Sequence, residues 1–427
     1  MQSGRAEVER HLAAGDLVGA RRASEAYLAA QPGNTDALAV HAAVLMSAGD
    51  LEGASRLLAG PAARPDAPFD ITLRYGLCRA SLGDPAGARP ALEAAVRARP
   101  DDPAVRLCLA EAVDEIDARA ALPLYFRSVC DAQNRGQWLS DATTPVPLRD
   151  RVKHAMQRID GGRQALFQQV LEPHVAAFGP DSLRRVADAL MLYLGLRPAP
   201  PADPRQRPKF FWMPSLPPTA FFDRALFPWY EALEAQAPAI REEMLARLAE
   251  PKDFEPFLGT SDKAVEAQYL AGDAASRAWD AYFFFRHGER FDAHHAACPR
   301  TSQALGDVPL TRIRHHAPEV LFSVLAPQSH ITPHHGVTNT RVVTHLPLLI
   351  PEGDCALVVG GETHRWQQGR CITFDDTFLH EAWNRTSATR VVMILDTWNP
   401  HLDEAERITL KDLVETIGDF NAAAGIV

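Results

Sequence analysis

A chain of 427 residues is too long for one simple domain, so two or three domains are expected. Its 46% hydrophobic and 23% charged residues are typical of globular proteins and argue against wholesale disorder, while a net charge of −10 argues against a nucleic-acid partner. The polar first residues and the lack of a long apolar run predict a cytoplasmic protein with no signal peptide and no membrane span. The six cysteines form no C-x-x-C pair and are expected to be reduced thiols.

The first region of the chain repeats with a period of 34 residues, which is the period of the tetratricopeptide unit. In each unit a glycine provides the tight turn between two helices, a small alanine lets the second helix approach the first, and a proline ends the unit. The recurring residues are Gly15, Gly49 and Gly83 in the turns, Ala20, Ala54 and Ala88 in the second helices, and Pro32, Pro65 and Pro100 at the ends.

A fourth unit begins near Asp102 and has Ile116-Asp117-Ala118 where the glycine turn would be, as terminal repeats often differ from the others. Residues 1–130 are therefore predicted to form an all-α, tetratricopeptide-like solenoid. Residues 131–208 are predicted to form a helical connector that ends in a stiff proline-rich linker. The prolines of the linker are Pro198, Pro200, Pro201, Pro204 and Pro208.

Residues 209–427 are predicted to form a separate domain that combines helices and strands. Helices are expected over 221–235 and 238–249. Beyond Val320 short β-rich runs follow one another, separated by Gly, Pro, Asn and Asp, which indicates a double-stranded β-helix (a jelly roll, cupin-like) with flanking helices. The expected strands span residues 320–326, 341–350, 356–359, 370–374 and 390–398, and the fold class is α+β, multidomain.

Two histidine-bearing segments, residues 330–336 and 374–381, are candidates for a metal site. The iron of a mononuclear oxygenase is commonly held by H-x-D/E and a distant histidine, but the residue two positions after His334 is Gly336. His335 competes with His334 as the ligand. Neighbouring strand residues point to opposite faces, so these two histidines are not expected to bind one metal ion together.

An ordered series of motifs surrounds these histidines: SVLAP from Ser323, PHHGVTNTR from Pro333, HL at His345, WQQG from Trp366, FDDTFLHE from Phe374, then Arg390 and DTWNP from Asp396. Together they resemble the catalytic core of the aspartyl/asparaginyl β-hydroxylase family. A weaker resemblance reaches back to residues 211–216 and to Trp279. The resemblance covers most of the third region and none of the repeats.

The resemblance implies an Fe(II) site made by His334 and His380, and because the family lacks the carboxylate ligand, Gly336 agrees with it. Arg390 matches the arginine that binds the far carboxylate of 2-oxoglutarate, with Ser323 as its hydroxyl helper. An arginine that faces a barrel interior needs an anion in any case, and a salt bridge with Asp396 is the alternative reading.

His345 and Trp279 match residues near the other carboxylate of 2-oxoglutarate. Arg341 matches one of two arginines with which the family often holds its substrate, and the second position is Val343. That departure puts recognition of an aspartate side chain in doubt. Asp375 and Asp376 are expected to shape the turn before His380, and Trp366 is expected to be a core aromatic with no role in the site.

The resemblance implies that the protein uses Fe(II), 2-oxoglutarate and O2 to hydroxylate the β-carbon of an Asp- or Asn-type residue, with release of succinate and CO2. The repeats would hold the peptide or protein substrate. One alternative is a hydroxylase or halogenase that acts on a small or carrier-tethered amino acid, and another is a non-catalytic repeat adaptor. Succinate production separates enzyme from adaptor, and a chlorinated product separates halogenase from hydroxylase.

Overall fold

The structure is a computed structural model of the chain, and it describes residues 3–198, 203–259, 268–272 and 278–426. Contacts divide the chain into two units, which are described separately: Met1–Ala165 with Asp419–Val427, and Leu166–Gly418. The domain boundaries after residues 130 and 208 stay predictions. Pro200 and Pro201 of the predicted linker lie outside the described residues.

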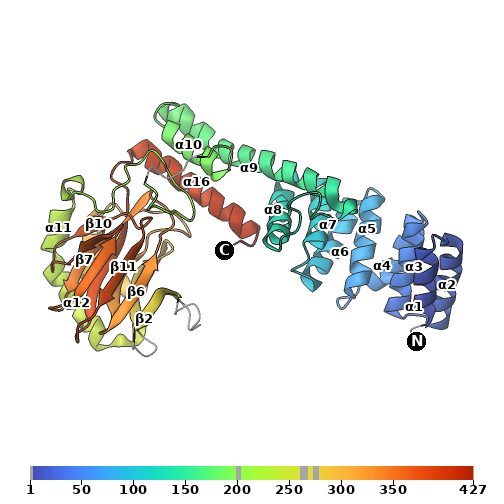
Figure 1. Cartoon of the computed structure of the whole chain (residues 1–427), viewed down its shortest axis with the longest axis horizontal. Helices are drawn as coiled ribbons and strands as arrows, with labels where there is room; N and C mark the ends of the chain where they lie inside the picture. The colour runs from blue at the N-terminus through green and yellow to red at the C-terminus, as the bar shows by residue number, and fades with distance from the viewer. Residues whose placement is uncertain (1–2, 199–202, 260–267, 273–277, 427) are drawn as a thin grey trace. The chain divides into compact units, whose positions relative to one another are not determined.

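The first unit contains the predicted helical repeats (Figure 1). Gly15, Gly49 and Gly83 each adopt a positive φ of 71° to 80°, which closes the turn within each repeat. The aspartate that follows each of them caps the next helix, as Asp16 does by accepting from the Gly19 N–H. The helices are α1 (Ser3–Ala13), α2 (Leu17–Ala30), α3 (Thr35–Ser47), α4 (Leu51–Ala62), α5 (Phe69–Ser81), α6 (Pro85–Ala98), α7 (Pro103–Asp114) and α8 (Ala118–Asn134), followed by the short η1 (Val146–Leu148).

Two long helices, α9 (Arg149–Phe178) and α16 (Glu404–Ala423), run through both units. The predicted helix over residues 221–235 is wrong in its first half, because Pro228 interrupts it and the Phe222 N–H donates to the Thr373 carbonyl of the sheet. The helix predicted over 238–249 is confirmed. The other helices are α10 (Arg184–Tyr193), η2 (Arg224–Leu226), α11 (Tyr230–Ala235), α12 (Ala237–Ala249), η3 (Pro251–Asp253), α14 (Asp292–Ala297), α15 (Pro299–Ala304) and η4 (Leu305–Asp307).

Among the described residues of the second unit, the strands form two antiparallel sheets (Figure 1). The larger sheet has the order β1-β3-β5-β12-β7-β10, with β4 on β3, and the smaller has the order β2-β6-β11-β8-β9. The strands are β1 (Glu255–Pro256), β2 (Leu270–Gly272), β3 (Trp279–Arg286), β4 (Glu289–Arg290), β5 (Val320–Leu325), β6 (Ser329–His334), β7 (Arg341–Leu349), β8 (Cys355–Val359), β9 (Glu362–His364), β10 (Ile372–Phe374), β11 (His380–Asn384) and β12 (Arg390–Trp398).

The two faces of the larger sheet have different partners, because side chains alternate along each strand. On one face Phe322 and Met393 join Ile240 of α12 in a large apolar core. On the other face Val392 packs with residues of the smaller sheet, such as Leu357. The five predicted strands are confirmed to within two residues, and the facing sheets are compatible with the predicted jelly roll.

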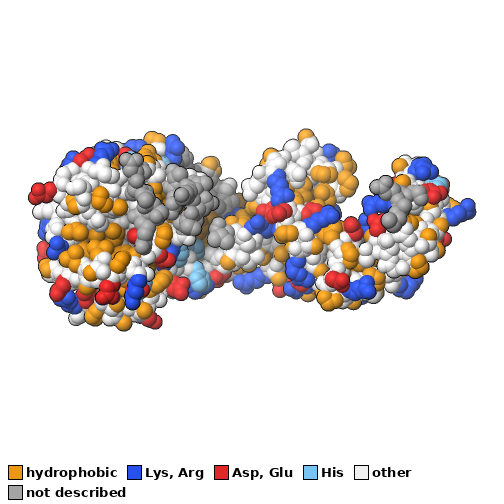
Figure 2. All heavy atoms as spheres, turned by 90° about the horizontal axis from the view of Figure 1, so that it is seen from below, with side chains coloured by type: hydrophobic (Ala, Val, Ile, Leu, Met, Phe, Trp, Pro, Cys, Tyr) orange, Lys and Arg blue, Asp and Glu red, His pale blue; other side chains and the backbone are white. Residues whose placement is uncertain are grey.

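The surface carries both signs of charge, and Figure 2 shows basic and acidic side chains interspersed on the face in view. Such mixing accords with the modest net charge of −10. No helix in the described ranges is long and apolar enough to cross a membrane.

Candidate active site

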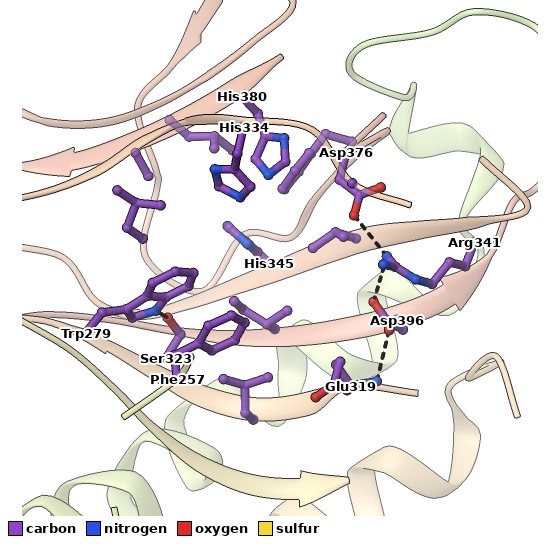
Figure 3. A pocket seen from close by; sticks show the side chains of 18 of the residues that line it. Phe257, Trp279, Glu319, Ser323, His334, Arg341, His345, Asp376, His380 and Asp396 are labelled. Atoms are coloured by element: carbon purple, nitrogen blue, oxygen red, sulfur yellow. Dashed lines mark hydrogen bonds and ion pairs between the residues drawn. The ribbon is translucent and has the colours of Figure 1, made fainter. Parts of the chain in front are cut away.

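A pocket of about 230 Å³ lies between the two sheets of the second unit (Figure 3). Strands β5, β7 and β12 of the larger sheet contribute one wall, and β6, β8 and β11 of the smaller sheet contribute the opposite wall. The pocket contains every residue that the sequence predicted for the site, although their roles stay predictions. These residues are Trp279, Ser323, His334, Arg341, Val343, His345, His380 and Arg390.

His334 and His380 lie side by side, because β6 and β11 pair antiparallel with these two residues opposite one another. Their ring centroids are 4.1 Å apart and their planes are inclined by 54°. His334 lines the pocket, whereas the ring of His335 bonds through Nδ1 to the Thr377 carbonyl, at 2.9 Å. β6 ends at His334, and the next residue, His335, bonds outside the pocket, so the two neighbouring histidines are not arranged to bind one metal ion.

Both imidazoles of the pair have the tautomer and the neutral charge that metal binding requires. Each Nδ1 donates to a carbonyl two residues earlier, His334 to Thr332 at 2.8 Å and His380 to Phe378 at 3.1 Å, so the lone pair of each neutral ring is on Nε2. Burial lowers the pKa of His334, and burial together with the charge of His334 lowers the pKa of His380 to about 4. The rings are therefore neutral at pH 7, which is the form that binds metal ions.

No group of three or more His, Cys, Asp or Glu side chains is arranged to hold a metal ion in the part of the chain that the structure describes. The pair fits a metal centre with two protein ligands, which leaves several coordination positions for small ligands. Gly336 lies beside the pair, at the position where the common motif has a carboxylate.

Arg390 is a buried cation with no acidic partner among the described residues. Its side chain is 1% exposed and its Nε atom has no hydrogen-bond partner, while Nη1 donates weakly to the carbonyl and hydroxyl oxygens of Ser323 at 3.3 and 3.4 Å. Burial lowers the pKa of Arg390 to about 10. An unpaired buried guanidinium is costly, so this end of the pocket is suited to an anion.

Trp366 orients two of the predicted cosubstrate residues. Its indole N–H donates to Nδ1 of His345 at 3.2 Å, and the guanidinium carbon of Arg390 lies 4.9 Å from its ring centroid. Burial and the charge of Arg390 lower the pKa of His345 well below its usual range. A neutral His345 that accepts at Nδ1 carries its proton on Nε2, where it can donate to a ligand.

Trp279 closes the same end of the pocket. Its indole N–H donates to the Ser323 hydroxyl at 2.9 Å, and its ring stacks on Phe257 with centroids 3.9 Å apart. The Ser323 hydroxyl thus accepts from both Trp279 and Arg390. Ser323, Trp279 and Arg390 therefore form one polar group at this end.

Arg341 lies at the other end of the pocket and is already paired. Its Nη1 atom is 3.1 Å from Oδ2 of Asp376 and 3.2 Å from Oδ1 of Asp396. Burial acts to lower the pKa of Arg341, but the two carboxylates outweigh it and the pKa is raised. Asp396 pairs with Arg341 and not with Arg390, which was the alternative partner considered for Arg390.

The two neighbouring aspartates before His380 have different surroundings. Asp375 shapes the turn as predicted, because its Oδ1 atom accepts from the backbone N–H and the hydroxyl of Thr377. Asp376 instead enters the pocket and fills the space beside Gly336: a Cβ atom placed on Gly336 would lie 2.1 Å from the carboxyl carbon of Asp376.

Sequence reasoning missed the entry of Asp376 and Glu319 into this pocket. Trp366 is the core aromatic that the sequence predicted, but its contacts with His345 and Arg390 were not foreseen. Trp366 and Asp376 stand inside motifs that were singled out, but nothing in a motif shows which side chain contacts which. Glu319 immediately precedes β5, and its direction follows from the alternation with Leu321 and Ser323. This alternation is the feature of the sequence from which the direction of Glu319 could have been predicted.

Comparisons with known proteins find different families in the first and the second part of the chain. Residues 234–400 match the family model described as Aspartyl/Asparaginyl beta-hydroxylase, and residues 11–70 and 69–112 match tetratricopeptide repeat models. The aspartate beta-hydroxylase domain-containing protein 2 of Xenopus tropicalis is 30% identical over 60% of this chain and 66% of that protein.

Two further relatives are hydroxylases with different names. The aspartyl/asparaginyl beta-hydroxylase of Homo sapiens is 31% identical over 42% of this chain and 22% of that protein. The ornithine lipid ester-linked acyl 2-hydroxylase of Rhizobium tropici is 32% identical over 42% of this chain and 60% of that protein. This chain spans 56% to 66% of the human and Xenopus domain-containing proteins 2. Residues 234–400 therefore form an Aspartyl/Asparaginyl beta-hydroxylase family domain, and tetratricopeptide repeats precede it in the chain.

Proposed function

We propose that the protein is an Fe(II)- and 2-oxoglutarate-dependent dioxygenase that hydroxylates an amino-acid residue of a peptide or protein. The observation that carries the proposal is the coexistence, in one pocket, of two neutral histidines and a buried arginine without an acidic partner. Fe(II) bound there would supply the oxygen activation that couples conversion of 2-oxoglutarate to succinate and CO2 with insertion of oxygen into a substrate C–H bond.

His334 and His380 are the proposed ligands, because both Nε2 lone pairs are available in the pocket. Arg390 would hold the far carboxylate of 2-oxoglutarate through its Nη groups, and Ser323 would add a hydroxyl. His345 would donate from Nε2 to the other carboxylate, in the tautomer that Trp366 selects. Trp279 keeps the Ser323 hydroxyl in place and covers this end from solvent.

The substrate end is lined by Arg341 and Val343, and the family resemblance implies an Asp- or Asn-type residue there with hydroxylation at the β-carbon. Val343 is 8% exposed and presents an apolar wall where the family often has a second arginine. The tetratricopeptide repeats support a polypeptide substrate, because such repeats commonly hold extended segments of other proteins.

The halogenase alternative is less favourable. A halide would need the room beside Gly336, but the carboxylate of Asp376 occupies that room and its negative charge would repel the ion. The non-catalytic adaptor is also less favourable, because an adaptor has no need of a buried unpaired arginine facing two histidines.

The test is incubation of the full chain with Fe(II), 2-oxoglutarate and O2, with succinate measured first in the absence of any substrate. We expect slow succinate formation that His380→Ala abolishes and that the pocket-remote variant Glu362→Gln retains. Mass spectrometry of candidate peptides should then show a gain of one oxygen. Absence of succinate under all these conditions would reject the proposed function.

A further inference from the structure

The pocket wall made by the larger sheet has the same order of side chains on three neighbouring strands. β5 and β7 both pair antiparallel with β12, so β5 and β7 run in the same direction. In that direction each strand presents a charged residue, then an apolar residue, then a predicted cosubstrate residue. The series are Glu319, Leu321 and Ser323 at β5, Asp396, Ile394 and Arg390 on β12, and Arg341, Val343 and His345 on β7.

Negative charge dominates the end of the wall that lies away from the cosubstrate residues (Figure 3). Arg341 is the guanidinium at this end, and it is shared between Asp376 and Asp396. Glu319 adds a third carboxylate, whose partner is the exposed imidazole of His287 at 3.0 Å. Even with a protonated His287, the carboxylates described at this end outnumber the cations three to two.

One of these carboxylates has an unused acceptor. Asp376 is 6% exposed and lines the pocket, and its Oδ1 atom has no hydrogen-bond partner. A buried carboxylate oxygen normally accepts a hydrogen bond. A ligand group that carries positive charge would offset the excess of carboxylates at this end, whereas a substrate carboxylate would meet repulsion from all three acidic side chains.

The middle of the wall is apolar. Leu321 and Ile394 are paired with one another, between the acidic residues Glu319 and Asp396 and the cosubstrate residues Ser323 and Arg390. Val343 is paired with Asp396 and adds an apolar side chain at the acidic end. Four residues along a strand, from Glu319 to Ser323, span about 13 Å. A side chain with an aliphatic stem and a cationic tip has the matching order of apolar and charged parts.

We propose that the substrate residue carries a basic side chain, lysine- or arginine-like, whose cationic tip is held by Glu319, Asp376 and Asp396. Its aliphatic stem lies along Leu321, Val343 and Ile394, in the pocket that His334 and His380 also line. The proposal rests on the proposed function, in which an amino-acid residue of a peptide or protein is hydroxylated, and it replaces the Asp- or Asn-type residue implied by the family resemblance with a basic residue. The doubly paired Arg341 then holds the acidic side chains in place and does not bind a substrate carboxylate.

The test is equilibrium binding of the full chain, under argon with Fe(II), to matched peptides that differ only in a central Lys, Arg, Leu or Asp. Binding is measured with and without 2-oxoglutarate, and free lysine is a separate arm. We expect a Lys or Arg peptide to bind at least about tenfold more tightly than the Leu peptide, with the Asp peptide weakest. Equal affinity for the Asp or Leu peptide would overturn the proposal, as would no binding of any basic ligand. If free lysine binds and the lysine peptide does not, the substrate is not a residue within a peptide, and that part of the proposal is overturned.

Glu319→Gln is the informative variant, because glutamine keeps an acceptor oxygen for His287 and removes only the charge. The affinity for the lysine peptide should fall about tenfold and that for the aspartate peptide should rise. Glu362→Gln, an exposed residue of β9 outside the pocket, should change neither. Unchanged affinities in Glu319→Gln would overturn the proposal. Succinate formation without peptide is recorded for the wild-type protein, so that failure of the proposed function is seen independently.

Discussion

The indole of Trp366 donates its N–H to His345 and lies under the guanidinium of Arg390, so one side chain orients two proposed cosubstrate ligands. Both side chains are buried and line the pocket, and Arg390 also donates to the Ser323 carbonyl. Trp366 is itself 6% exposed and packed in the core between the sheets. Because Trp366 is fixed by this packing, it restricts the movement of His345 and Arg390.

The two contacts of Trp366 can be separated by substitution. Trp366→Phe keeps an aromatic ring under Arg390 and removes the donor to His345, so 2-oxoglutarate affinity should fall about fivefold, in line with the loss of about 1 kcal/mol for one hydrogen bond. Trp366→Leu removes both contacts and should lose more. Titration of 2-oxoglutarate into the Fe(II) protein measures both. Wild-type affinity in Trp366→Phe would show that the N–H has no part in orienting His345.

Arg390→Met should have opposite effects on the free and the ligand-bound protein. Burying an unpaired guanidinium is costly, so the variant should melt at the same or a higher temperature without 2-oxoglutarate. Its affinity for 2-oxoglutarate should fall by about 3 kcal/mol, as expected for a lost buried charge pair, so the cosubstrate should no longer raise Tm. Arg365→Met, at an exposed site, is the control. A full thermal shift with 2-oxoglutarate in Arg390→Met would contradict the assignment.

Iron binding should depend on His334 and His380 and not on His335. His380→Ala removes one of two ligands and should abolish most Fe(II) binding, whereas His335→Ala removes only a ring that bonds to the Thr377 carbonyl. Calorimetric titration with Fe(II) under argon gives the comparison. Retained iron binding in His334→Ala, together with its loss in His335→Ala, would reverse the assignment.

Preference for a basic peptide should weaken in acid because of Asp396. Burial raises the pKa of Asp396 to about 6, against the opposing effect of Arg341, while Glu319 and Asp376 also face it. Below that pH Asp396 becomes neutral and the acidic end loses one negative charge. The ratio of affinities for the lysine and leucine peptides should therefore fall as pH decreases from 7 to 5, and taking the ratio cancels effects common to both peptides. A ratio that rises or stays constant would remove Asp396 from cation binding.

The second unit should need helix α10 in order to fold. Arg185 on α10 forms a bidentate pair with Glu406, which is 1% exposed, and also donates to the His401 carbonyl. A chain that begins at residue 208 lacks α10 and therefore loses the pair between Arg185 and Glu406 and the donation to the His401 carbonyl. It should melt at a clearly lower temperature than a chain that begins at residue 166, as followed by circular dichroism. Equal melting temperatures would show that the pair is dispensable.

The repeats and the later strands could be predicted because their signals are local. A glycine with positive φ and a capping aspartate every 34 residues leave a direct trace in the sequence. The five strands predicted after Val320 are rich in β-branched residues and bounded by turn residues, whereas β6, β9 and β11 were not predicted. β3 was missed because its run of aromatic residues is buried on both faces and shows no alternation.

The contents of the pocket could be predicted from ordered motifs, but its charge balance could not. Arg341 and Asp396 are 55 residues apart and meet only because β7 and β12 pair in one particular register. The direction of the Asp376 side chain likewise depends on the conformation of the turn after β10. In this turn Asp375 bonds to Thr377, whereas the next residue, Asp376, enters the pocket. Such pairings follow from tertiary structure, which a motif does not encode.

The carboxyl group of Asp376 also constrains how the proposed metal site could change over time. A side chain at position 336 and the present side chain at position 376 cannot occupy the same space. A single mutation of Gly336 to Asp or Glu would therefore meet a steric and electrostatic clash instead of restoring a third ligand. The two positions are epistatic: a lineage could regain the three-ligand site only after residue 376 had become smaller, and the intermediate would leave Arg341 with one carboxylate fewer.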